Sequence, residues 1–183
     1  VGLRKPALIA ASGAFLGFAV FTKAALVILI PAYGYYLWAN MKRTLVNEKL
    51  PLAWFTAPLL SWFTIMAILN WYRFSSPWDF GYGSEAAQFT TPLWTGLYGL
   101  LLGPNKGLIF YAPLTLLLPW ALWRRESKQY SIDRIFLLCV IAVQIIFMAK
   151  WWSWEGGASW GPRLLLPILP FIVSAVGLLL QSS

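Results

Sequence analysis

The sequence contains no histidine and one cysteine, and only 11% of its 183 residues are charged. Without histidine, the chain cannot build His-ligated zinc, a His-ligated haem or a Ser-His-Asp triad. Cys139 has no second cysteine to pair with and lies in an apolar run, so we expect a small buried hydrophobe there. An average soluble domain carries about 25% charged residues, so this chain has too few polar groups to cover a water-soluble fold.

Apolar and aromatic residues are abundant instead. Hydrophobic residues make up 60% of the chain, with 12 Trp, 8 Tyr and 12 Phe. Runs of about 20 apolar residues are long enough to cross a bilayer core, and Trp and Tyr favour its interfaces. The net charge of +8 comes largely from short loops, so we interpret it as a topology signal and a contact with anionic lipid, not as a nucleic-acid site. The sequence therefore predicts a multi-pass integral membrane protein.

The apolar runs predict an all-α fold, a polytopic transmembrane helix bundle of about five or six membrane helices. The first run, from about Pro6 to Trp38, is too long for one straight span at 1.5 Å per residue. We interpret it as a hairpin of helices over about 7–21 and 24–39, hinged near Lys23; one long tilted helix is the alternative. Further membrane helices are expected over about 52–70, 108–123, 135–149 and 164–180.

Basic residues suggest how the helices are oriented. Arg4, Lys5 and the loops at 41–51 and 124–134 hold most of the Lys and Arg, so they should be cytoplasmic under the positive-inside rule. A hairpin at Lys23 places all three groups on one side, whereas a single span would place Arg4 and Lys5 outside. This consistency favours the hairpin.

Two aromatic loops, 70–107 and 150–163, then share the outer face, where polar chemistry could be built. In the first, a short interfacial helix should end at the Gly103-Pro104 turn. Residues 1–183 are expected to form a single transmembrane domain. Because apolar runs lie close to both ends, we expect a piece of a longer membrane protein.

Three charged residues outside the second loop are candidates with two interpretations each. Lys23 lies in an apolar run, which is costly, so it either binds a lipid phosphate or sugar diphosphate or is a lysine snorkelling from a helix end. Asp79 could be a base or metal ligand, but a turn cap or ion pair is favoured. Lys106 precedes a helix, where anions bind, although a lysine at headgroup level is slightly favoured.

The strongest pattern is KWWSWEGGASWGPRLLLPILP, from Lys150 to Pro170. Its paired glycines permit tight turns, and its Trp side chains can stack on sugar rings or cover isoprenoid chains. Arg163 can bind a phosphate through two hydrogen bonds, and Glu155 can bind a hydroxyl. An aromatic belt explains the Trp residues but does not require Glu-Gly-Gly or Trp-Gly-Pro-Arg, so the pattern favours a binding function.

The run WEGGASWGPRLLLPILPF resembles the C-terminal signature of polyprenyl-phosphate-dependent membrane glycosyltransferases of the C-type superfamily (GT-C fold), which includes protein O-mannosyltransferases and lipid A aminoarabinose transferases. Arg163, Pro167 and Pro170 match this signature, while its Tyr position is Leu164. GFAVFTKAALVILIP resembles the family's helix pair, in which a lysine, here Lys23, lies near the lipid-phosphate pocket. NWYRFSSPWDFGYG and LLLGPNKGLIFYAPLTLL resemble an outer loop and helix start of family members.

The resemblance implies the second half of an inverting enzyme that moves a hexosyl or pentosyl group from a polyprenyl-phosphate carrier to a protein, lipid or glycan. The family's catalytic acid lies in the first outer loop, so we expect the general base upstream of this chain and little activity from the chain alone. The expected partners are a polyprenyl-phosphate sugar donor and membrane lipid. Residues expected to contact lipid phosphate or substrate are Lys23, Arg73, Lys106, Lys150, Glu155, Trp160 and Arg163.

No cofactor is assured and no metal ligand is assigned, although some superfamily members use a divalent metal. A non-enzymatic transporter or flippase for lipid-linked sugars is the alternative function. Transporters often show internal repeats and polar residues at mid-membrane, and neither is visible here. The sugar, the acceptor, the carrier and the oligomeric state stay open.

Overall fold

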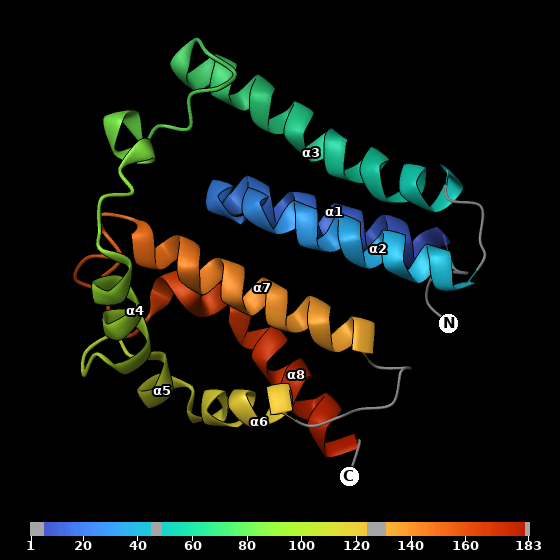
Figure 1. The fold of residues 1–183 in the computed structure, drawn as a ribbon. Coiled ribbons are helices and arrows are strands. Elements are labelled where there is room, and N and C mark those ends of the chain that lie inside the picture. The colour runs from blue at the N-terminus through green and yellow to red at the C-terminus, as the bar shows by residue number, and fades with distance from the viewer. Residues whose placement is uncertain (1–5, 45–48, 124–130, 182–183) are drawn as a thin grey trace. The chain divides into compact units, whose positions relative to one another are not determined.

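The protein is seen in a computed structural model that describes residues 6–44, 49–123 and 131–181 (Figure 1). Every regular element in these ranges is helical, which confirms the all-α class. Among the described residues, three helical segments are long and apolar enough to cross a membrane, as expected of a membrane protein: Ala24–Lys42, Pro51–Phe74 and Ser131–Lys150. Shorter apolar helices occur at Pro6–Thr22, Leu93–Leu102 and Arg163–Leu178.

The chain folds as two compact units, Val1–Ala87 and Gln88–Ser183. The single transmembrane domain therefore stays a prediction. The orientation in the membrane is also still a prediction, because most of the basic residues that suggested it lie outside the described residues: Arg4, Lys5, Arg124, Arg125 and Lys128.

The first unit contains a helical hairpin followed by a long helix. Its elements are α1 (Pro6–Thr22), a 3₁₀-helix (Ala24–Leu29), α2 (Ile30–Thr44), α3 (Lys49–Phe74) and a second 3₁₀-helix (Gly83–Ala87). Lys23 interrupts the first apolar run with an extended backbone, φ −146° and ψ 97°. The chain turns back at this residue, so α1 and α2 run in opposite directions (Figure 1). The predicted pair of helices is confirmed, and the single long helix is not observed.

Glycines on α1 allow it to pack closely on α3. A Cβ atom at Gly13 would collide with the backbone carbonyl of Phe55, and one at Gly17 would lie 2.7 Å from Cδ1 of Trp62. The Phe18 ring lies 5.1 Å from the Trp62 ring, centroid to centroid. Small residues four apart let membrane helices approach closely enough for backbone contacts, which explains why these two helices form the core of the unit.

The second unit contains shorter helices around one long one. Its elements are α4 (Leu93–Leu102), α5 (Leu108–Tyr111), a 3₁₀-helix (Pro113–Leu117), α6 (Leu118–Trp123), α7 (Ser131–Lys150), a 3₁₀-helix (Arg163–Ile168) and α8 (Leu169–Gln181). The helix α4 ends at Gly103, as the sequence predicts. One face of α7 is buried, with Val140 and Ala149 fully covered.

The structure corrects the prediction of a continuous helix over 108–123. The backbone leaves the helical region at Ala112, with φ −138° and ψ 73°. Pro113 is the cause, because a proline disfavours helical geometry in the residue before it and cannot donate a hydrogen bond. The predicted helix over 164–180 likewise begins as a 3₁₀-helix that contains Pro167.

Cys139 is exposed, so the expectation of a buried cysteine is wrong. The residues of α7 that are buried are Leu137, Val140, Ile141, Gln144, Met148 and Ala149. Cys139 lies outside this stripe, on the face of a candidate membrane span that is open to its surroundings.

Candidate functional site

The loop between α7 and the 3₁₀-helix at Arg163–Ile168 is built around three glycines in the left-handed region. Their φ values are 69° at Gly156, 71° at Gly157 and 68° at Gly161. Side chains rarely tolerate this conformation, so glycine is the residue type that fits. The tight turns predicted for the paired glycines are therefore present.

Lys106 ties this loop to the turn after α4. Its Nζ donates to the carbonyl of Gly157 at 2.9 Å and to the carbonyl of Ser159, and Oγ of Ser159 lies 3.5 Å away. The Ser159 hydroxyl also donates to the Gly156 carbonyl at 3.2 Å. Lys106 is half-buried. Neither sequence-based interpretation of Lys106 anticipated these contacts, because the acceptors lie far away in the chain.

The beginning of the loop is also held by the segment before α4. The hydroxyl of Thr91 donates to the Trp151 carbonyl at 2.9 Å, and the Thr91 amide donates to the Lys150 carbonyl at 3.3 Å. The Trp152 amide donates to the Gln88 carbonyl at 2.9 Å. The loop is thus fixed near both of its ends by the part of the chain around α4.

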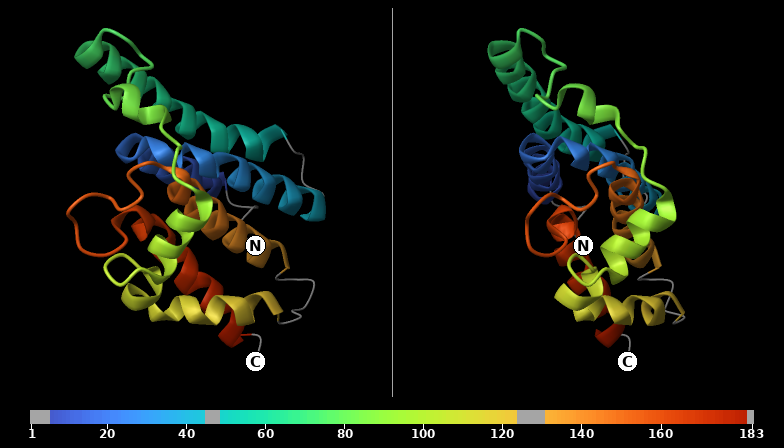
Figure 2. Two further views of the ribbon diagram at one scale, coloured as in Figure 1. Left: turned by 60° about the vertical axis from the view of Figure 1, so that its left-hand side comes forward. Right: turned by 90° about the vertical axis from the view of Figure 1, so that its left-hand side faces the viewer.

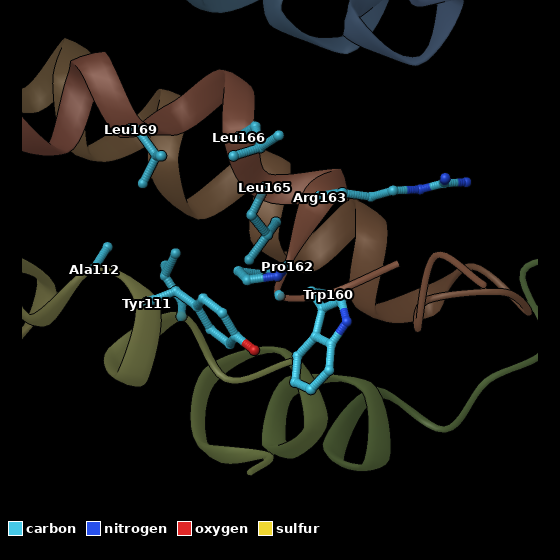
Figure 3. Close-up of a pocket in the computed structure, with 10 residues that line it drawn as sticks. Tyr111, Ala112, Trp160, Pro162, Arg163, Leu165, Leu166 and Leu169 are labelled. Carbon is cyan, nitrogen blue, oxygen red and sulfur yellow. The ribbon is translucent and has the colours of Figure 1, made fainter. Parts of the chain in front are cut away.

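An apolar cavity of about 210 Å³ lies beside the end of the loop. Leu165, Leu166 and Leu169 line one side, and the Tyr111 and Trp160 rings line the opposite side (Figure 3). The Tyr111 hydroxyl donates to the Asn105 carbonyl at 3.3 Å, and a Cβ at Gly161 would lie 3.0 Å from the Tyr111 ring. Because glycine has no Cβ, residue 161 leaves room for the Tyr111 ring.

Arg163 lies at the edge of the cavity, but its side chain extends away from the Tyr111 and Trp160 rings (Figure 3). It is exposed, and its aliphatic part packs against Gly156, where an added Cβ would lie 3.2 Å from Cγ. Within the described part of the chain, its guanidinium makes no hydrogen bond or ion pair. The cation is therefore positioned by packing and is available to an anion.

Five of the seven predicted contact residues belong to the second unit. Lys150 is half-buried at the end of α7, Glu155 is exposed on the loop, and the Trp160 side chain is 88% exposed. Lys106 is hydrogen-bonded to the same loop, which directly precedes Arg163 in the chain. The other two predicted residues belong to the first unit: Lys23 is half-buried at the helix break, and Arg73 is exposed near the end of α3.

Asp79 caps a turn, which is one of the two roles that the sequence favours for it. One carboxylate oxygen of Asp79 accepts a hydrogen bond from the Gly81 amide at 2.8 Å, which is a turn-capping contact. Among residues 6–44, 49–123 and 131–181, no group of three His, Cys, Asp or Glu side chains could hold a metal ion. The need for a divalent metal therefore stays open.

Gln144 is a buried polar residue that is not among the candidates predicted from the sequence. It is fully buried in α7, and its Nε2 donates to the Leu164 carbonyl at 3.4 Å. In a 3₁₀-helix the Leu164 carbonyl would accept from the N–H of residue 167, but Pro167 has no N–H. The side-chain amide of Gln144 supplies a donor from another helix instead. Its Oε1 atom is buried without a partner. A side-chain amide in the middle of an apolar helix is the feature of the sequence that indicates such a buried polar contact.

These features describe a helical protein that has candidate membrane spans and a constrained, aromatic and basic loop. No protein-family model matches the chain, no curated protein is significantly similar to it, and no solved structure is significantly similar to it. An assignment of function therefore rests on the residues and their geometry.

Proposed function

We propose that this chain is the lipid-phosphate side of a membrane glycosyltransferase that uses a polyprenyl-phosphate sugar on the outer face of the membrane. The observation that supports this most directly is the position of Arg163. Its guanidinium has no protein partner in the described part of the chain, and the residue borders an apolar cavity of about 210 Å³. A polyprenyl phosphate combines the two matching features, an apolar chain and a phosphate.

The chemistry that would suit Arg163 is stabilisation of the leaving group. In an inverting transfer, the acceptor oxygen forms a bond to the anomeric carbon while the bond from that carbon to the phosphate oxygen breaks. The acceptor proton goes to an acidic general base, which we do not assign to any residue of this chain, and the phosphate gains negative charge. A charged donor in position stabilises such developing charge by a few kcal/mol, roughly, in comparable sites.

The remaining residues take supporting roles in this proposal. Trp160, which is 88% exposed, would stack on a sugar ring or cover an isoprenoid unit, and Glu155 would bind a sugar hydroxyl. Lys150 is a second cation on the same loop. Lys106 already binds backbone carbonyls, so we assign it to holding the loop rather than to the phosphate. Lys23 and Arg73, which belong to the first unit, stay sequence-based candidates for phosphate contact.

A binding experiment tests the proposal on the chain itself. Native mass spectrometry of the purified chain would compare undecaprenyl phosphate with undecaprenol, which differ only in the phosphate. We expect the phosphate form to bind about tenfold or more tightly, since a hydrogen bond to a charged group contributes roughly 1.5–3 kcal/mol. Arg163→Ala should remove this preference. The matched control is Arg134→Ala, at the other end of α7, which should keep it.

An activity assay tests the same proposal in the full natural protein. Arg163→Ala should lower the turnover of a polyprenyl-phosphate sugar by about 100-fold or more, by analogy with the removal of one charge-stabilising donor elsewhere. Equal affinity of the native chain for both lipids, or normal turnover by a well-expressed Arg163→Ala enzyme, would contradict the proposal.

A transporter of lipid-linked sugars is the second candidate. The helix breaks at Lys23 and Ala112 favour it, because interrupted helices often line the substrate sites of transporters. Vesicles that contain the full natural protein would separate the two functions. Release of free polyprenyl phosphate would support the transferase, whereas movement of the intact lipid-linked sugar without release would support the transporter.

A further inference from the structure

The helix α4 has two faces that differ in packing. Gly96 and Gly99 form the inner face: a Cβ at Gly96 would collide with the Ala149 backbone carbonyl, and one at Gly99 would collide with the Trp154 indole. Leu100 is also buried, at 1% exposure. The inner face of α4 is therefore fixed against the end of α7 and the start of the loop.

The outer face of α4 is a stripe of three residues spaced four apart, Trp94, Tyr98 and Leu102. Their side chains are 80%, 63% and 50% exposed. Residues spaced four apart lie on one side of a helix, so these three form a continuous surface. The chain has no charged residue between Glu85 and Lys106, so this surface is aromatic and apolar without a charged rim of its own.

The position of α4 in the second unit indicates the environment of this aromatic and apolar stripe. It packs on the last turn of α7, a candidate membrane span that ends at Lys150. Just before α4, Thr91 binds the backbone of Lys150 and Trp151. In Figures 1 and 2, α4 runs across the end of α7 and not alongside it. The short helix thus lies at the level where α7 would leave the bilayer.

We infer that α4 lies in the plane of the membrane, with Trp94, Tyr98 and Leu102 inserted at the boundary between lipid headgroups and acyl chains. Ten residues span only about 15 Å, half of a bilayer core, so α4 cannot cross the membrane by itself. Trp and Tyr favour this boundary, and an uncharged stripe does not require anionic lipid. The inference adds a face and an orientation to the interfacial helix expected from sequence, and it does not depend on the proposed enzymatic function.

Depth measurements with spin labels test this orientation. Single cysteines at 94, 98 and 102, in a Cys139→Ala background, would carry nitroxides in the full chain reconstituted in phosphatidylcholine vesicles. Collision rates with oxygen and with an aqueous nickel complex report the depth of each label. We expect the three labels to lie within about 5 Å of one depth, because a helix in the membrane plane keeps its residues level.

Each other outcome would overturn the inference. A helix along the bilayer normal would separate positions 94 and 102 by about 12 Å of depth, at 1.5 Å per residue. High access to nickel at all three positions would indicate water, and low access to both reagents would indicate a protein contact. Native Cys139, which is exposed near the middle of α7, gives the depth of the span as a reference.

A second measurement avoids large labels. Fluorotryptophan would be incorporated throughout the native chain, and the variant Trp94→Phe would identify the Trp94 resonance. Spin-labelled lipid should broaden this resonance, whereas an aqueous gadolinium chelate should leave it sharp. Broadening by the chelate alone would show that Trp94 faces water and would contradict the inference.

Discussion

The two aromatic segments of the chain, 71–87 and 151–162, have similar composition and are held in different ways. In the first, Asp79 binds the amide of Gly81 and Asn70 donates to the carbonyl of Pro77, so these contacts join near neighbours. In the second, the bonds from Lys106 and Thr91 join residues 51 to 60 positions apart in sequence.

This difference indicates which segment is better suited to bind a ligand. A loop fixed by distant partners has already lost much of its freedom, so a ligand that binds it orders fewer side chains and loses less affinity. Both segments carry exposed tryptophans, with Trp78 at 80% and Trp160 at 88% exposure. Aromatic content therefore does not distinguish them, whereas long-range hydrogen bonding does.

The largest effect should come from moving α4 away from α7. Gly96→Ala would place a methyl group against the Ala149 backbone, which cannot move aside as a side chain could. We expect the free energy of unfolding to fall by about 3 kcal/mol, at the upper end for overpacking. Thermal or denaturant unfolding in detergent, followed by circular dichroism, would measure it.

The control for this variant is Gly177→Ala in α8, where an added Cβ meets nothing within 4 Å. It should leave stability unchanged or raise it by up to about 1 kcal/mol, because alanine favours helices. Equal stability of the Gly96→Ala and native proteins would show that α4 does not need its close approach to α7.

A smaller effect is expected from releasing the second segment directly. Lys106→Met removes the ammonium that binds the Gly157 and Ser159 carbonyls. We expect a loss of about 2 kcal/mol, in the lower part of the range for charged donors because Lys106 is only half-buried and water screens it. Hydrogen exchange read by mass spectrometry should become faster across 156–160.

Two variants separate this effect from a general loss of charge. Lys106→Arg should recover part of the protection, and Lys150→Met should leave it intact, since no hydrogen bond from the Lys150 side chain is found among the described residues. Unchanged exchange across 156–160 in Lys106→Met would show that the loop keeps its shape without the lysine.

Gln144→Met should have a still smaller effect, on the helix that follows the second segment. The change removes one hydrogen bond to the Leu164 carbonyl and one buried acceptor without a partner, and these contributions oppose each other. We expect a loss of about 0.6 kcal/mol, the mean for hydrogen bonds between membrane helices. A loss of more than about 2 kcal/mol in an unfolding titration would mean that the Oε1 atom has a partner.

The smallest effect should come from the first segment. Asp79→Ala removes one exposed turn cap and should change the free energy of unfolding by less than about 0.5 kcal/mol. Exchange across 151–162 should not change. A larger loss in the same unfolding assay would show that the first segment, like the second, depends on distant partners.

Local signals in the sequence predicted much of the helical pattern. The break at Lys23 followed from the length of the apolar run, and the end of α4 followed from Gly103-Pro104. Pro113 is a local signal for a break, but the apolar run around it predicts an unbroken helix, which the structure does not have. Helices can be predicted from the sequence because they depend on residues that are close in the chain. The error arose where a proline and an apolar run gave opposite indications.

The geometry of the candidate site was only partly predictable. The turns at Gly156 and Gly157 follow from the conformational freedom of glycine. The contacts from Lys106, in contrast, depend on how the unit folds, and a lysine before a helix gives no indication of acceptors about 50 residues later. The cavity beside Tyr111 and Trp160 likewise arises from residues that only the fold brings together.

The contact of Gly13 with Phe55 has a consequence for biosynthesis. The ribosome makes Phe55 about 40 residues after Gly13, roughly 2 to 8 seconds later at 5–20 residues per second. During that interval α1 exists without its final partner. The uncharged sequence of α1 is suited to this interval, because lipid can solvate α1 until α3 is synthesised.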